Sequence, residues 1–193
     1  MEGFEMTAGR SVTAEMVTSR QTQEVQGQIV MAKRFPRDEI AARNRILTAC
    51  QRKRLAEQAE YEYKRGTSKV TGTSIRLAEA MAQNWGNMDF GYVELERRSG
   101  ESVVMAQAWD LETNTRQTRT FTVPHIRETK NGSYPLTSDR DINEMVSNQA
   151  ARRVRACILG IIRGTYRKKR LSSAVRHSWT AKKSRLLISL RIA

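Results

Sequence analysis

Apolar and polar residues alternate along residues 88–123 in three runs that turn-forming residues separate. Alternation with a period of two is typical of strands that bury one face. The first two runs place these side chains on one face: Met88, Phe90, Tyr92 (or Val93) and Leu95, then Val103, Met105, Gln107 and Trp109. Arg97–Gly100 and Glu112–Thr115 have turn sequences, and Pro124 ends the Thr-rich third run, Arg116–Val123. The pattern predicts a three-stranded antiparallel meander.

A helical period follows the meander. Ser138 and Asp141 have the spacing of a capping box, which predicts a helix that continues to about Ile162. Its apolar face consists of Ile142, Met145, Val146, Ala150, Val154, Cys157, Ile158 and Ile161. Asn148, Arg152 and Arg155 share another face because positions i, i+4 and i+7 stack on a helix, and Arg153 projects between the two faces.

Helices are also predicted before the meander. The first covers residues 13–34, and Phe35–Pro36 separates it from a second that runs, with a kink allowed, to Ala59. A short third helix begins with Thr73 or Ser74 as its cap and ends at Gly86–Asn87.

The remaining segments are one short strand and two loops. Tyr61–Lys64 alternates as a strand does, and we place it at the edge of the meander. Residues 65–72 and 125–137 are polar and contain glycine, so they are predicted loops. The result is an α+β fold: a three- to four-stranded antiparallel meander packed against helices. We assign residues 1–14 to a disordered N-terminus, 15–162 to one core domain and 163–193 to a basic tail.

The net charge of +14 is concentrated near the C-terminus. Residues 163–193 contain ten Lys or Arg and no acid, so residues 1–162 hold 34 − 10 = 24 bases against 20 acids. Such a tail attracts polyanions by counterion release without reading sequence. Two interpretations of the tail stay open: a disordered DNA-binding segment, or sequence read from a shifted frame, which the other reading frames of the encoding DNA would reveal.

Several classes of site have no support in the sequence. The cysteines Cys50 and Cys157 and the histidines His125 and His177 are not spaced as zinc ligands, and we interpret both cysteines as buried apolar residues. No P-loop motif is present. There is no apolar run of about 20 residues and no signal-peptide core, which favours a cytoplasmic protein without a membrane partner. We therefore expect neither a metal nor another cofactor.

A Mg²⁺-dependent nuclease is the enzymatic alternative. Such a site needs converging acids with a lysine nearby, and Glu62–Lys64 with Asp110 and Glu112 offers those residue types. No acid lies on a predicted strand shortly before Glu62, since the candidate Asp38 opens a helix, and Asp110 and Glu112 lead into a turn. Solvated strand ends and turns explain these acids more simply.

Basic residues near predicted turns and on the last helix favour nucleic-acid binding. The candidate residues are Arg152, Arg153, Arg155, Arg97, Arg98, Arg116, Arg119, Lys64, Arg65 and Lys69. Arginine and lysine along a groove bind a single-strand backbone, and exposed aromatic rings stack on bases. Tyr61, Tyr63 and Tyr92 are the candidates for stacking, whereas Trp85, Phe90 and Trp109 are assigned to the core. An individual arginine on a protein surface is more often simply solvated.

Two segments and the order of elements resemble a known superfamily. Asn84–Gly91, the meander, and Asn148–Ala156 on the following helix resemble prophage proteins of the single-strand annealing superfamily, which includes RecT, Erf and the Rad-fifty-two-like proteins. The resemblance spans about residues 25–162. It implies a β-β-β-α core, rings or filaments of identical subunits, and a basic groove that holds single-stranded DNA without ATP.

The resemblance also implies residue roles and partners. Arg152 and Arg153 match the paired basic residues that line the groove, Arg155 extends the pair, and Arg97, Arg98, Arg116 and Arg119 are hairpin counterparts. A phage exonuclease in a bacterial host is a further candidate partner. We therefore expect a non-catalytic annealing protein in which these cations form one continuous channel. A nuclease and a non-catalytic scaffold or host-interaction protein are the alternatives.

Overall fold

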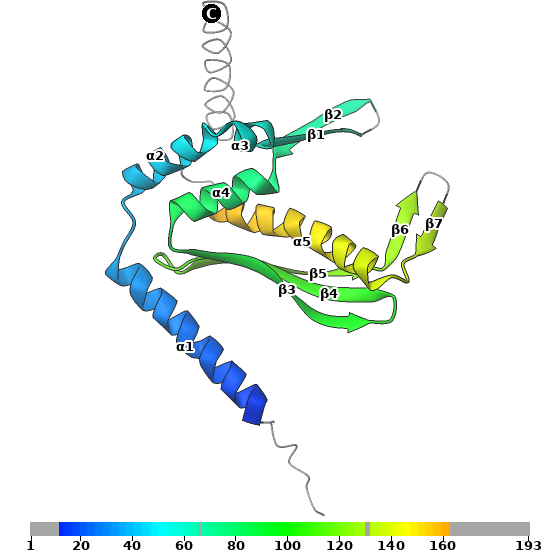
Figure 1. The fold of residues 1–193 in the computed structure, drawn as a ribbon, viewed down its shortest axis with the longest axis horizontal. Helices are drawn as coiled ribbons and strands as arrows, with labels where there is room; N and C mark the ends of the chain where they lie inside the picture. The colour runs from blue at the N-terminus through cyan, green and yellow to red at the C-terminus, as the bar shows by residue number, and fades with distance from the viewer. Residues whose placement is uncertain (1–11, 66, 130–131, 163–193) are drawn as a thin grey trace, which may run out of the picture.

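The computed structural model describes residues 12–65, 67–129 and 132–162. Within these ranges the fold is α+β, as expected, with helices and antiparallel strands in separate segments (Figure 1). The helices are α1 (Val12–Arg34), α2 (Glu39–Cys50), α3 (Lys53–Glu57), α4 (Ile75–Trp85) and α5 (Asp139–Ile162). The strands are β1 (Glu60–Arg65), β2 (Ser68–Thr73), β3 (Met88–Arg98), β4 (Glu101–Asp110), β5 (Thr115–Pro124), β6 (Ile126–Thr129) and β7 (Gly132–Pro135).

The predicted meander is confirmed. Strands β3, β4 and β5 pair antiparallel in that order, with Tyr92 opposite Ala106 and Ala106 opposite Arg119. Gly100 in the first turn has φ of 84° and Asn114 in the second has φ of 55°, conformations that glycine and asparagine tolerate best. A bulge between Glu94 and Glu96 shifts the register near the first turn.

Helix α5 lies across one face of the meander, and α4 packs beside it (Figure 1). The core lies between these layers and α2. Its buried residues include Ile46, Met81, Trp85, Ala106, Ala108, Val154, Cys157, Ile158 and Ile162. Ser74 caps α4 by accepting a hydrogen bond from the Leu77 backbone N–H, and Gly86, with φ of 81°, ends it. Both free cysteines are buried, as the sequence predicts.

The face of β4 that enters the core is not the one expected. Val104, Ala106 and Ala108 are buried beneath α5, whereas Val103, Met105 and Trp109 point to the opposite face. The assignment of Trp109 to the core is therefore wrong, while Trp85 is buried and Phe90 packs at the edge of the core. Small residues let the helix approach the sheet closely, so they occupy the core side of this strand.

Two predicted loops are β-hairpins. Tyr61–Lys64 does not extend the meander but pairs with β2, where a polar loop was expected, in a separate two-stranded sheet. Residues 126–129 and 132–135 form the hairpin β6–β7, also in place of a loop. Both hairpins project from the body (Figure 1). Strands β2, β6 and β7 bury little, so their sequences lack the alternation that marks the meander, whereas β1 alternates and was predicted as a strand.

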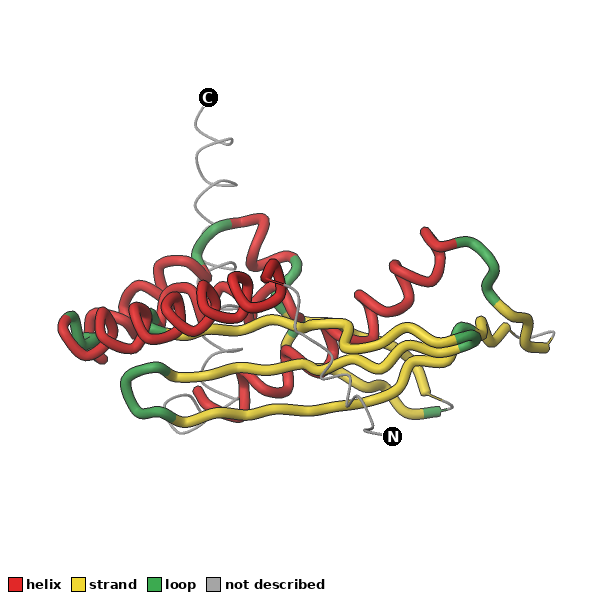
Figure 2. Tube along the Cα trace, turned by 90° about the horizontal axis from the view of Figure 1, so that it is seen from below, coloured by secondary structure: helices red, strands yellow, loops and turns green. Residues whose placement is uncertain are grey.

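The predicted N-terminal helices differ from the structure in one respect. The long helix after Pro36 is two helices, because the chain leaves helical geometry at Arg52, which has ψ of 124°. Figure 2, which views the molecule from below, shows the strands of the meander side by side. Within the described ranges, no helix combines the length and apolar character needed to cross a bilayer.

Candidate nucleic-acid interface

Four arginines lie around one turn of α5 and on the strand beneath it. Three of them, Arg152, Arg153 and Arg155, project in successive directions around the helix because consecutive residues are rotated by about 100°. Arg119 projects from β5 on the helix side of the sheet, opposite the core residue Ala106. We call Arg119, Arg152, Arg153 and Arg155 the cationic belt. It runs from the edge strand β5 over α5 toward the hairpin β1–β2.

Arg153 fixes the part of the belt nearest to β5. Its guanidinium lies 4.1 Å from the centre of the Phe121 ring and donates to the Gln149 backbone carbonyl at 3.0 Å and side-chain oxygen at 2.5 Å. Burial, together with the charges of Arg152 and Arg119, lowers the pKa of Arg153. Three like charges therefore crowd together here, and an anion between them would relieve their repulsion.

A cleft of about 530 Å³ adjoins the belt on the hairpin side. It is lined by Tyr61, Glu62, Ser74, Ile75, Arg152 and Arg155. The Arg155 guanidinium lies 4.5 Å from the centre of the Tyr61 ring, in a cation–π contact. Besides the Glu62 carboxylate, which pairs with Lys69, the cleft contains two guanidinium groups, an aromatic ring and an aliphatic side chain. Guanidinium groups and aromatic rings are the groups that contact phosphates and bases of a single strand.

The belt has no internal counter-charge. None of its four arginines forms an ion pair with a carboxylate in the part of the chain that the structure describes. For the three α5 arginines, the sequence contributes to this: no Asp or Glu occurs after Glu144, so none lies within reach on the following turns of the helix. Sequence reasoning placed the start of the acid-free segment at residue 163 and so missed that it already includes the second half of α5.

Arg97 and Arg98 lie at the β3–β4 turn and do not join the belt. Arg97 donates to both carboxylate oxygens of Glu94, at 2.8 and 2.9 Å, and to Asn143 on the first part of α5. Arg98 pairs with Glu96 at 2.6 Å and with Glu101 at 3.7 Å. The Arg97 guanidinium, by hydrogen bonding, holds the pKa of Glu94 at about 2. The charges of both arginines are thus neutralised locally.

Two other sequence-predicted cations, Arg116 and Lys69, are also separate from the belt. Arg116 lies on the opposite face of the meander, 5.4 Å from the Trp109 ring, and donates to Gln107. Lys69 on β2 pairs with Glu62 at 2.8 Å. Lys64 and Arg65 are the last two residues of β1, and their side chains lie outside the described part of the structure.

The candidate stacking residues divide in the same way. Tyr61 contributes to the cleft, whereas the Tyr92 hydroxyl hydrogen-bonds to Ser147 on α5 at 2.9 Å. The side chain of Tyr63 lies outside what the structure describes. Fewer of the predicted residues therefore come together than the single channel required. Among the described side chains, the structure brings together Arg119, Arg152, Arg153, Arg155 and Tyr61.

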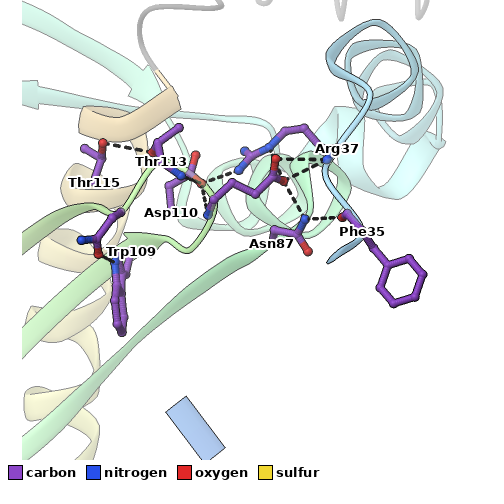
Figure 3. Close-up of polar contacts among 9 residues, drawn as sticks. Phe35, Arg37, Asn87, Trp109, Asp110, Thr113 and Thr115 are labelled. Atoms are coloured by element: carbon purple, nitrogen blue, oxygen red, sulfur yellow. Dashed lines mark hydrogen bonds and ion pairs between the residues drawn. The ribbon is translucent and has the colours of Figure 1, made fainter. Parts of the chain in front are cut away.

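The acids considered for a nuclease have other partners. Asp110 and Glu112 both form ion pairs with Arg37, whose Nε lies 2.8 Å from a Glu112 oxygen. The Asn87 side chain donates hydrogen bonds to Glu112 and to the Phe35 backbone carbonyl (Figure 3). Arg37 and Asp110 side chains are each 5% exposed, so this network joins the α1–α2 connection to the end of the sheet. Among the described residues, no three His, Cys, Asp or Glu side chains gather in a metal-binding arrangement.

The candidate interface thus consists of the arginine belt, the adjoining cleft and one aromatic ring, all on the helix-covered side of the meander. Comparisons with protein-family models, curated proteins and solved structures found no significant match to this chain.

Proposed function

We propose that this chain binds single-stranded nucleic acid along the cationic belt and anneals complementary strands without ATP and without catalysis. The observation that carries the proposal is the absence of carboxylate partners for Arg119, Arg152, Arg153 and Arg155 among the described residues, beside a cleft that contains Tyr61. The charges at the β3–β4 turn are neutralised by glutamates and those of the belt are not, so we assign phosphate binding to the belt and not to the turn.

The proposed mechanism is backbone neutralisation. Guanidinium groups of the belt contact phosphates, which lowers the repulsion between two strands and leaves base edges free to pair. The Tyr61 ring supports a base at the edge of the cleft, since stacking is tolerant of sequence. A DNA-recombination role in the cytoplasm of a bacterial host, alongside a phage exonuclease, is the biological setting that the resemblance to annealing proteins supports.

A matched pair of double variants tests the proposal. Arg152→Ala with Arg155→Ala removes two belt charges, and Arg97→Ala with Arg98→Ala removes two acid-paired charges, so both proteins have the same net charge. At about 0.1 M salt, we expect the belt variant to bind a labelled oligo-dT about 10- to 100-fold more weakly. Each hydrogen bond to a charged group contributes about 1.5–3 kcal/mol, and we expect the basic tail to compensate for part of this loss. The control should change affinity by less than about threefold.

The salt dependence of the oligo-dT affinity provides a second test of the proposal with the same variants. Loss of two phosphate contacts should reduce the slope of log affinity against log salt by about 1.4, because each contact on a single strand contributes about 0.7. Fluorescence anisotropy over a salt series measures both quantities, and circular dichroism checks that each variant is folded. Equal losses in the two variants would mean that net charge alone governs binding, and would contradict the belt as the site.

Strand annealing needs its own assay. Wild-type protein should accelerate the pairing of two complementary labelled oligonucleotides in buffer that contains EDTA and no nucleotide. Energy transfer between the two labels measures the rate of pairing. The belt variant should lose this acceleration in proportion to its loss of binding. Tight binding without acceleration would limit the function to strand binding, whereas cleavage of labelled DNA after Mg²⁺ addition would favour the nuclease alternative.

A further inference from the structure

Gly72 lies in the interior of β2, where a glycine is unfavourable. Glycine has more backbone freedom to lose than other residues and no side chain to pack in a strand. The two usual reasons for a strand glycine are absent here. The pairing of β1 with β2 continues without a bulge, and Gly72 is not one of the glycines with positive φ in the described chain. The backbone at position 72 therefore suits any residue.

The ring of Tyr61 occupies the space where a side chain at position 72 would stand. Tyr61 lies directly opposite Gly72 in the register, so both positions face the same side of the hairpin. A Cβ on Gly72 would lie 2.5 Å from the Tyr61 hydroxyl oxygen, 2.6 Å from Cζ and 2.8 Å from Cε1. No side chain fits at position 72 unless the ring moves. The missing side chain thus lets the ring lie across β2.

The base of the hairpin is anchored close to this pair. The Ser74 backbone N–H donates to the Ala59 carbonyl at 2.8 Å, and Ala59 is 1% exposed in the core. Ser74 also caps α4. Because the two strands are tied to the core here, a larger residue at position 72 would be accommodated by movement of the Tyr61 side chain and not of the strands.

The Tyr61 ring in turn contacts a belt arginine. The Arg155 guanidinium lies 4.5 Å from the centre of the ring, and both side chains line the cleft beside the belt. The ring therefore links the backbone of β2 to a cation on α5. An arginine held against an aromatic ring has fewer orientations than one in solvent, so less entropy remains to be lost when it binds a phosphate.

We infer that Gly72 is a positioning residue of the cleft: its missing side chain sets the Tyr61 ring, and the ring orders the Arg155 guanidinium before a phosphate binds. The inference rests on the proposed binding of single strands along the cationic belt and adds how the site is prepared for it. Aromatic cover of a strand glycine is known to stabilise sheets. The contact with Arg155 gives that cover a second role, in binding.

Gly72→Ala tests the inference, and Gly91→Ala is its matched control. Gly91 also lies inside a strand, β3, without positive φ, but a Cβ there would meet no atom within 4 Å. Both substitutions retain every charge of the chain. At about 0.1 M salt, Gly72→Ala should bind labelled oligo-dT about two- to tenfold more weakly, which corresponds to ordering one long side chain during binding. Gly91→Ala should stay within about 1.5-fold of wild type, since it displaces nothing.

Two further variants place the effect on the Tyr61 ring. In a Tyr61→Ala background, Gly72→Ala should not weaken binding further, because the ring that it displaces is absent. In Gly72→Ala alone, the slope of log affinity against log salt should keep its wild-type value because both cleft arginines remain, whereas Arg155→Ala should reduce it by about 0.7. A purely structural role of Gly72 would change the urea midpoint and leave the oligo-dT affinity of the folded protein unchanged.

A measurement without nucleic acid follows the positioning directly. The Nε–Hε signal of Arg155 in a heteronuclear NMR spectrum, assigned by its absence from Arg155→Ala, carries a ring-current shift from Tyr61. In Gly72→Ala this signal should move toward its position in Tyr61→Ala. In Gly91→Ala it should stay at its wild-type position.

Three results would overturn the inference. They are an Arg155 signal that Gly72→Ala leaves in place, an oligo-dT affinity that Gly72→Ala leaves unchanged while Arg155→Ala weakens it, and a full additional loss from Gly72→Ala in the Tyr61→Ala background. The proposed function fails in a different way, through a wild-type protein that does not bind oligo-dT. The Arg155 signal still decides in that case whether Gly72 sets the ring.

Discussion

Two groups of arginines that look equivalent in the sequence have opposite environments in the structure. Arg97 and Arg98 at the β3–β4 turn are each bound to glutamates two or three residues away. Arg152 and Arg155 on α5 have no carboxylate partner among the described residues, and they line a cleft with Tyr61. A count of cations therefore does not locate a phosphate-binding surface. The distribution of nearby acids is what distinguishes the two groups.

Arg37 extends the comparison to the interior. It is bound to Asp110 and Glu112 and lies 4.8 Å from the Trp85 ring, so its charge serves the fold. Arginines paired with acids should thus contribute to the free energy of unfolding when they are buried, and should contribute very little when they are exposed. Belt arginines should affect nucleic-acid binding and have less influence on stability.

The largest effect is expected for Arg37→Ala. The substitution leaves Asp110, which is 4% exposed, without its counter-charge in a buried site, and removes the ring contact to Trp85. Loss of one partner of a buried ion pair typically costs about 3–5 kcal/mol. Urea unfolding followed by circular dichroism measures this loss.

Arg43→Ala is the matched control for Arg37→Ala. Arg43 forms an exposed pair with Glu39 one helical turn away, at 3.1 Å, and such pairs contribute about 0.3–0.5 kcal/mol. Comparable losses of stability in the two variants would contradict a special role of the buried network.

The fold was predictable where hydrophobic residues alternate. The meander and α5 were predicted nearly to their ends because each buries one regular face. The core face of β4 was not, because large side chains suggested the wrong face while Ala106 and Ala108 form the close contact with α5. Strand β2 and the hairpin β6–β7 were missed because strands that bury little have no hydrophobic period to detect, whereas β1 was predicted from its alternation.

The candidate site was predictable in part. The α5 arginines were identified from their spacing on one helix, which holds in the structure. Their separation from Arg97 and Arg98 depends on tertiary geometry, but a local signal existed: Glu94, Glu96 and Glu101 flank the turn arginines, and no acid follows Glu144. The cleft with Tyr61 could not be predicted, since it depends on where the hairpin β1–β2 lies relative to α5.

An intermediate effect is expected for Glu94→Gln, and it depends on pH. Hydrogen bonds from Arg97 and Ser102 lower the pKa of Glu94 from 4.5 to about 2. A carboxylate with a lowered pKa in the folded state stabilises the protein above pH 4.5, and this contribution disappears as the pH falls toward 2. At neutral pH the variant should lose about 1 kcal/mol, a value reduced for partial solvent exposure.

Urea unfolding at several pH values measures the Glu94 contribution. The difference between wild type and Glu94→Gln should shrink steadily from pH 5 to pH 2. A difference that stays constant over this range would show that the ion pair with Arg97 is not its origin. The oligo-dT affinity at neutral pH should not fall in this variant, because removing a negative charge outside the belt does not weaken phosphate binding.

The smallest effect is expected for Arg98→Ala, and it sharpens the comparison most. Arg98 has an exposed side chain whose charge is shared between Glu96 and Glu101, and hydrogen bonding to Glu96 raises its pKa. Its removal should leave the urea midpoint unchanged within error and alter oligo-dT affinity by less than about twofold. Arg152→Ala removes the same type of side chain from an exposed position without a carboxylate partner, and should weaken binding several-fold. The two variants have the same net charge, so any difference between their oligo-dT affinities, measured by anisotropy titration, arises from local neutralisation. Equal affinities would assign binding to overall charge and would remove the distinction between the turn and the belt.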